Sequence, residues 1–177
     1  MRRRALLAAF AASALLAGCA TPGRAPQAEA RSVSGRLSVQ VAATPQQAAR
    51  SVNADFDLQG GAERGELQLA TPMGTVLAQA RWRPGEVWLK SSDGERRFPT
   101  LSALADEVLG EPLPLDALFD WLRGRPWTGA PSRPLSAPEQ GFEQLGWSVD
   151  LQRWNEGLVT ARRGAAPAVT VKAKLTS

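Results

Sequence analysis

The stretch Gly65–Arg83, GELQLATPMGTVLAQARWR, decides the fold that the sequence predicts. Its two arms, residues 65–70 and 76–82, alternate apolar and polar side chains. A period of two residues is typical of strands with one buried face. Between the arms a proline and a glycine occupy positions suited to a tight turn. The stretch therefore predicts a β-hairpin whose turn is formed by residues 71–74.

The tip of this turn carries an apolar residue where polar residues are usual. Met73 stands between Pro72 and Gly74, whereas turn tips favour Asn, Asp and Ser. In one interpretation Met73 folds back onto the core. In the other, the side chain is held in solvent so that it can enter an apolar environment. The hairpin sequence alone does not decide between these interpretations.

The same alternation recurs along the chain and predicts an antiparallel meander of nine or ten strands joined by short turns. Besides the two hairpin arms, the alternating runs are residues 32–41, 51–59, 86–90, 96–98, 142–145, 147–154, 158–162 and 168–175. Each run has only one apolar face, so something must cover that face. The covering elements are expected between residues 98 and 142.

Two short amphipathic helices are predicted in that interval. Thr100 is suited to cap a helix over residues 101–109, and a second helix is expected over residues 115–123. A glycine follows each helix, and residues 125–141, with four prolines, are predicted to form a loop. The expected fold is mainly β: an incomplete antiparallel β-barrel, or half-barrel, with a short helical lid over its open side.

The N-terminus is predicted to lie outside this domain. Three arginines precede an apolar run over residues 5–17, as in a signal peptide that is too short to span a membrane. The run ends in Leu16-Ala17-Gly18-Cys19, which resembles the bacterial lipobox, in which the cysteine is acylated. An ordinary secretory cleavage site is the alternative. The expected division is a signal peptide (1–18), a lipidated tether (19–31) and a β-barrel domain (32–177).

The residue inventory argues against most enzyme chemistry. Histidine is absent and Cys19 is the only cysteine, so histidine triads, histidine-ligated metals and disulfides are not expected. No phosphate-binding glycine loop or Gly-x-Ser-x-Gly motif occurs, and the carboxylates form no evident pair. Of the 21 Lys and Arg, three lie in the signal peptide, which leaves 18 against 17 Asp and Glu. We expect no enzyme, no cofactor or metal, and no nucleic-acid binding.

The remaining chemical resource is apolar capacity. The chain has six tryptophans and no tyrosine. Filling the core is the simpler role for them, and we favour it for Trp82 and Trp147. A curved sheet of nine or ten strands nevertheless encloses more space than a few side chains occupy, and such barrels often hold an apolar ligand. With a lipid anchor, a lid and an apolar turn tip, this indicates a protein that handles acyl chains.

Together these features resemble the LolB family of outer-membrane lipoprotein receptors, over nearly the whole mature chain. The matching segments are Leu16-Ala-Gly-Cys19, Gly35-Arg36-Leu37-Ser38-Val39, Phe56, Leu67-x-Leu69-x-x-Pro72-Met73-Gly74, Leu109-Gly110-x-Pro112-Leu113-Pro114-Leu115, Trp121-Leu122-x-Gly124-x-Pro126 and Gly146-Trp147. The usual tip residue of the family, a leucine, corresponds to Met73. The chain also lacks the aromatic C-terminus that many relatives have.

The resemblance implies an incomplete barrel with a helical lid over an apolar cavity. It implies that the protein accepts lipoproteins from the periplasmic carrier LolA, binds their acyl chains, and inserts them into the inner leaflet of the outer membrane without nucleotide. The expected location is the periplasmic face of the outer membrane, as a monomer anchored through Cys19. Pro72, Met73 and Gly74 would form the membrane-insertion loop in contact with phospholipids.

Six residues are predicted to line the acyl-chain cavity: Phe56, Trp88, Leu104, Val108, Leu118 and Trp147. Two other functions stay open. One is a structural or assembly lipoprotein of the outer membrane, with a filled barrel, Met73 packed inside and no acyl-chain cargo. The other, weaker one is a lipid-degrading enzyme, for which the sequence shows no nucleophile and base.

Overall fold

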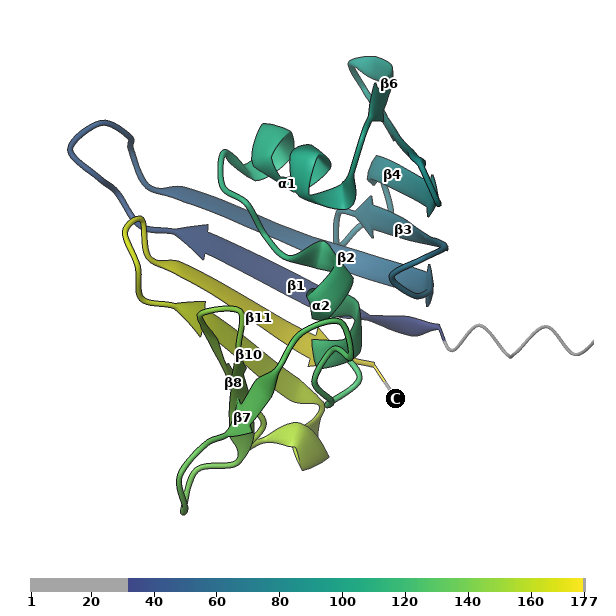
Figure 1. Ribbon diagram of the computed structural model, residues 1–177. Helices are drawn as coiled ribbons and strands as arrows, with labels where there is room; N and C mark the ends of the chain where they lie inside the picture. Colours follow the sequence, from purple (N-terminus) through teal and green to yellow (C-terminus); the bar gives the residue numbers. More distant parts are fainter. Residues whose placement is uncertain (1–31, 177) are drawn as a thin grey trace, which may run out of the picture.

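The computed structural model describes residues 32–176, which form one curved sheet with two helices on one of its faces (Figure 1). The predicted signal peptide (1–18) and tether (19–31), including Cys19, lie outside the described residues and stay predictions. The elements are β1 (Val33–Val41), β2 (Arg50–Gly60), β3 (Gly65–Ala70), β4 (Val76–Arg83), β5 (Glu86–Ser91), β6 (Gly94–Phe98), α1 (Leu101–Leu109), α2 (Leu115–Trp121), β7 (Ser132–Pro134), β8 (Gly141–Gln144), β9 (Trp147–Asp150), the 3-10 helix η1 (Trp154–Glu156), β10 (Leu158–Arg163) and β11 (Val169–Leu175).

The eleven strands form a single antiparallel sheet in the order β6-β5-β4-β3-β2-β1-β11-β10-β9-β8-β7. Strands that are neighbours in the chain pair with each other, except at the centre of the sheet. There β1 pairs with β11, from Gly35 opposite Leu175 to Val41 opposite Val169. The sheet therefore consists of two meanders, β1–β6 and β7–β11, joined along this central pair. Because β6 and β7 end the order unjoined, the barrel is open, and the predicted incomplete antiparallel barrel is confirmed.

Both predicted helices form. Helix α1 follows Thr100, whose Oγ1 accepts a hydrogen bond from the N–H of Ala103 at 3.1 Å. It ends at Gly110, which has a left-handed conformation with φ of 69°. Helix α2 ends at Trp121 rather than at Arg123, because the chain turns directly after it. Helix positions were therefore predicted correctly, and the end of α2 was placed two residues too late.

Helix α2 fills the space between the two meanders. Phe119 stacks on Trp82 of β4, with ring centroids 4.8 Å apart and planes 10° apart. Trp121 reaches the other meander, where its ring centroid lies 5.9 Å from that of Trp147 and 6.5 Å from that of Phe142. Aromatic side chains from both halves of the sheet thus pack on one helix, and the core is continuous across the half-barrel.

One strand lies where the sequence predicted only a loop. β7 lies within residues 125–141 and pairs with β8. The buried side chain of Gln144 holds this segment: its amide donates to the carbonyl oxygen of Trp127 at 2.7 Å, and its Oε1 accepts from the indole N–H of Trp121 at 2.8 Å. β7 has only three residues, one of them a proline, and so has no alternation from which the strand could be predicted.

The boundary of β9 also differs from the prediction. This strand stops at Asp150, whereas the alternating run was read as far as Trp154. The N–H of Gln152 donates to the Asp150 carboxylate at 2.9 Å, and η1 begins at Trp154. A local side-chain hydrogen bond thus ends the strand before the apolar alternation does.

The antiparallel order sorts the turns onto two ends of the barrel. One end, called the open rim here, carries the turns after β1, β3, β5, β8 and β10, which are residues 42–49, 71–75, 92–93, 145–146 and 164–168. The opposite end, called the base, carries residues 61–64, 84–85, 135–140 and 151–157. β1 starts and β11 ends at the base, where the N–H of Thr176 donates to the carbonyl oxygen of Ser34 at 2.8 Å.

Candidate functional site

The β3–β4 turn holds Met73 in solvent on a closed loop. The N–H of Gly74 donates to the carbonyl oxygen of Thr71, and the N–H of Thr71 donates to that of Thr75, both at 2.8 Å. The Thr71 hydroxyl also accepts from the N–H of Thr75 at 3.1 Å. Met73 itself is 95 % exposed. The interpretation in which Met73 folds back onto the core is therefore wrong.

Two more apolar side chains flank this turn. Val76 and Leu77 are both exposed, and they lie where the β3–β4 register shifts: Leu69 pairs with Ala78, but Ala70 pairs with Val76. We call Met73, Val76 and Leu77 the β3–β4 tip. The sequence predicted Met73 as the protruding residue and did not predict the other two, since alternation alone places Val76 on the buried face.

All the exposed large hydrophobic side chains of residues 32–176 lie at the open rim. Besides the β3–β4 tip, they are Val108 and Leu145. Val108 lies near the end of α1. This end is close to the rim, because Arg50, the first residue of β2, packs against Gly110: a Cβ at Gly110 would lie 2.3 Å from Arg50 Nη1. Leu145 lies in the β8–β9 turn. The rim therefore carries apolar surface on both meanders and at the end of the lid.

Leu145 has an unusual backbone conformation. Among the residues that the structure describes, it is the only non-glycine residue with positive φ, at 53°, and Gly146 follows with φ of 77°. Gln144 and Trp147 pair across this two-residue turn. Positive φ at both positions is the type I′ geometry that favours Asn-Gly, and leucine there costs roughly 1 kcal/mol. Its side chain is 48 % exposed, so packing only partly offsets that cost.

Four of the six predicted cavity residues lie together on the inner face. Phe56, Leu104, Leu118 and Trp147 are buried in one core cluster with the aromatic side chains of α2. Val108 does not join them, because it is exposed at the rim. The four residues occupy the region in which an acyl-chain cavity was expected, and their contact with acyl chains stays a prediction.

The sixth residue, Trp88, lies on the opposite face of the sheet. Its strand neighbours Val87 and Leu89 are buried, so alternation turns Trp88 outward. There the guanidinium of Arg97 stands 3.7 Å from its ring centroid. This position does not fit a wall of the inner cavity. The same alternation of Val87, Trp88 and Leu89 is readable in the sequence.

A buried ion pair fastens the segment between the helices to the sheet. Arg163 Nη2 donates to Glu111 Oε2 at 2.8 Å, and their side chains are only 16 % and 11 % exposed. The same guanidinium donates to the carbonyl oxygen of Pro167 at 3.1 Å and lies 5.6 Å from the Trp147 ring centroid. Arg163 Nε is buried without a hydrogen-bond partner within residues 32–176. Since 52 residues separate the pair, no sequence motif indicated it.

Helix α1 is fastened less firmly. Leu101, Leu104 and Ala105 are buried against the core, as expected for an amphipathic helix. On its outer side, Arg96 of β6 donates to Glu107 at 2.8 Å, but both side chains are about half exposed. Exposed pairs of this kind contribute little to stability. The lid is therefore held mainly by apolar contacts and by the Glu111–Arg163 pair beyond its end.

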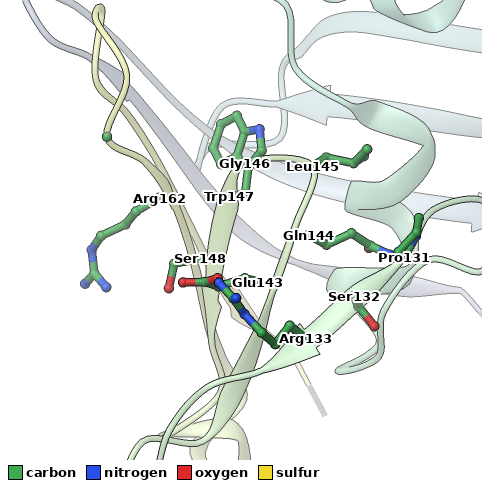
Figure 2. A pocket seen from close by; sticks show the side chains of 11 residues that line it. Pro131, Ser132, Arg133, Glu143, Gln144, Leu145, Gly146, Trp147, Ser148 and Arg162 are labelled. Atoms are coloured by element: carbon green, nitrogen blue, oxygen red, sulfur yellow. The ribbon is translucent and has the colours of Figure 1, made fainter.

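Figure 2 shows an open pocket of about 490 Å³ beside the β8–β9 turn. Leu145 and Gly146 lie at one edge of it, Arg133 reaches toward Glu143, and Arg162 extends on another side. Arg133 and Glu143 form an ion pair. Charged side chains line this pocket, so it does not provide the apolar surface that an acyl chain requires.

Other kinds of site find no support in the described part of the chain. It holds no group of three or more histidine, cysteine, aspartate or glutamate side chains placed to bind a metal ion. None of its helices is long and apolar enough to cross a membrane. Burial raises the pKa of Asp116 on α2, but no second carboxylate contacts it to make a catalytic pair.

Comparison with known proteins points to one family. The family described as "Outer membrane lipoprotein LolB" matches residues 29–173. An outer-membrane lipoprotein LolB of Bordetella petrii is 36 % identical over 161 residues, which cover 85 % of this chain and 80 % of that protein. The protein of the same name from Chromobacterium violaceum is 35 % identical, covering 86 % and 84 %. That of Cupriavidus pinatubonensis is 31 % identical, covering 93 % and 83 %.

Proposed function

The chain belongs to the LolB family and is an outer-membrane lipoprotein receptor, and from this premise we propose how it acts. It accepts lipoproteins from the periplasmic carrier LolA, holds their acyl chains between the sheet and the helices, and releases them into the inner leaflet of the outer membrane. The family is not an enzyme family, so the steps are binding steps only. The exposed Met73 on its closed turn is the observation that carries the proposal.

Acyl chains enter by taking the place of side chains from the lid. The inner face is occupied by α2, whose Leu118, Phe119 and Trp121 are buried against the sheet. Movement of the helices exposes Phe56 and Trp147 as apolar walls. Each methylene group buried contributes about 0.8 kcal/mol, so a long acyl chain compensates for displaced side-chain contacts. Small differences in fit between carrier, receptor and bilayer set the direction without nucleotide.

The β3–β4 tip acts at the release step. Its turn is fixed by three hydrogen bonds around Thr71, so Met73 is presented without a further ordering cost. Burial of this side chain in lipid contributes roughly 1.5–3 kcal/mol. That is enough to bring the open rim to the membrane and too little to anchor the protein. The anchor is the lipid on Cys19, which lies outside the described residues.

A second function is favoured by one observation. The inner face is well filled, with Trp121, Leu58 and Val149 almost fully buried. A structural outer-membrane lipoprotein with a permanently filled barrel would look the same. An apolar fluorescent probe separates the two functions, because a receptor whose lid moves binds the probe and a permanently filled core does not.

The deciding experiment uses the chain without its signal peptide and with Cys19→Ala, mixed with LolA that carries a radiolabelled lipoprotein. Co-purification then shows which protein holds the cargo. Transfer in the absence of nucleotide is the expected result. Cargo that stays on a carrier able to donate to an authentic receptor would contradict the proposal.

A further inference from the structure

The β8–β9 turn has a strained backbone at an apolar residue that is partly exposed. A type I′ turn is most stable with Asn-Gly, yet this one has Leu145 at φ of 53°. Leu145 stays about half exposed, so its strain is not explained by the core. Strained positions that the core does not require are candidates for contact with something outside the molecule.

The position of Leu145 in the barrel indicates what that contact is. The β8–β9 turn lies at the open rim, as does the β3–β4 tip. The two turns belong to different meanders, so the rim presents one apolar tip on each half of the open barrel. Exposed apolar side chains, Met73 and Leu145, therefore stand on two separate turns at the same end of the strands.

A lipid bilayer fits this arrangement better than a protein partner. A protein interface of ordinary size buries about 800 Å² on each side in one continuous patch. Here the apolar residues stand on separate turns, and charged pairs lie on the strands behind the β8–β9 turn: Arg133 pairs with Glu143, and Arg162 Nη1 lies 3.6 Å from Asp150 Oδ2. Separate apolar tips with charges behind them suit insertion into an interface, where the long arginine side chains reach the headgroups.

We propose that Leu145 is a second membrane-contacting residue, which acts with Met73 to orient the open rim toward the inner leaflet. This inference rests on the proposed function, because it gives the release step a direction. With one contact the barrel is free to tilt about Met73. With two, the opening between the meanders faces the bilayer, so acyl chains leave the inner face directly into lipid.

The test starts from the soluble chain with Cys19→Ala and without signal peptide, and measures its partition into vesicles of phosphatidylethanolamine and phosphatidylglycerol. Leu145→Asn is the informative variant, because asparagine relieves the backbone strain while it removes the apolar contact. We expect unchanged or higher thermal stability together with roughly threefold to tenfold weaker partition. The matched control is Leu158→Asn, at the outer face of the base, where partition should not change.

A second readout locates the side chain directly. With Cys19 replaced the chain has no other cysteine, so Leu145→Cys, Met73→Cys and Leu158→Cys each accept one environment-sensitive fluorophore. Vesicles should shift the emission to the blue at positions 145 and 73, and not at 158. No shift at position 145, with unchanged partition of Leu145→Asn, would overturn the inference.

The two proposals fail in distinguishable ways. If position 73 responds to vesicles and position 145 does not, only the second contact is wrong. If Leu145→Asn lowers acceptance of cargo from LolA but leaves partition unchanged, the turn contacts a protein, and the inference is likewise wrong. Failure of cargo transfer to the unmodified soluble chain would instead contradict the receptor function itself.

Discussion

The two ends of the barrel differ in which side chains they expose and how their polar groups are paired. At the base, polar groups meet one another: Arg123 donates to the carbonyl oxygen of Gly60 at 2.6 Å, and the indole N–H of Trp82 donates to that of Gly61 at 2.8 Å. Arg83 and Arg153 form ion pairs across their turns. At the open rim, apolar side chains stand in solvent instead.

This difference separates stability from function along the barrel axis. The base satisfies backbone carbonyls with buried or partly buried donors, which is what a stable fold requires. The rim exposes apolar area and keeps a strained turn, neither of which stabilises the isolated protein. The rim also contains the Glu111–Arg163 ion pair, and this pair holds the lid rather than the tips.

The largest expected effect comes from removing the ion pair that holds the lid. Arg163→Ala leaves the Glu111 carboxylate buried without a partner, so the free energy of unfolding should fall by about 2–4 kcal/mol. Urea denaturation measures this change. The double variant Glu111→Gln, Arg163→Met should recover much of the loss, because it removes both charges. A single variant as stable as the wild type would show that the pair does not hold the lid.

The second effect is expected at the base. Arg123 donates to the carbonyl oxygens of Phe119 at 2.7 Å and Gly60 at 2.6 Å, and so connects α2 to the end of β2. Arg123→Ala should lower the free energy of unfolding by about 1–2 kcal/mol, since two partly buried carbonyl groups lose a charged donor. Vesicle partition of the folded protein should not change. A variant with impaired partition but normal stability would reverse the assignment of the two ends.

A substitution at the rim should leave stability almost unchanged and impair membrane insertion. Met73 is almost fully exposed, so Met73→Glu should alter the free energy of unfolding by no more than about 0.5 kcal/mol. Acceptance of cargo should stay largely intact while insertion into membranes is impaired, because a carboxylate does not enter lipid. Met73→Leu is the matched control and should insert normally. If Met73→Glu delivered cargo as well as the wild type, the exposed tip would have no role in release.

The smallest expected effect concerns the pKa values of two glutamates in ion pairs at the base. Hydrogen bonds from Arg83 and Arg153 lower the pKa of Glu86 and Glu156, respectively. A lowered carboxyl pKa contributes stability that is present above the pKa of the unfolded chain and is lost as pH falls through the folded pKa. Carboxyl NMR titration should find both midpoints below the pKa of an unpaired glutamate. Arg83→Gln should return Glu86 toward that value, and an unaltered midpoint would show that the pair does not form in solution.

Much of the fold was readable because its strands have one buried face. The alternation in Gly65–Arg83 fixed which side chains point inward, and the stripe on α1 fixed the face that packs on the sheet. The alternation could not show the register shift at the rim. Val76 has the sequence phase of a core residue but is exposed, because the shift pairs it with Ala70, which stands opposite the outward-facing Asp55. Burial depends on the neighbours as well as on the periodicity.

The candidate site was only partly predictable for the same reason. Met73 could be found because an apolar residue at a turn tip violates a local preference. Leu145 violates the same kind of preference, because Leu-Gly stands between two alternating runs where a hairpin turn favours Asn-Gly. The Glu111–Arg163 pair left no local trace, since only the folded sheet brings the two residues together.

The central pairing of β1 with β11 has a consequence for the order of assembly. Residues 35–41 pair with residues 169–175, which are separated from them by almost the whole length of the domain. The middle of the sheet is complete only when this pairing has formed. Contacts so distant in sequence form slowly. Until then β1 is an open edge rich in valine, the kind of strand that joins other chains. The half-barrel therefore depends on β11 to cover the edge of β1, and that edge stays open until residues 169–175 pair with it.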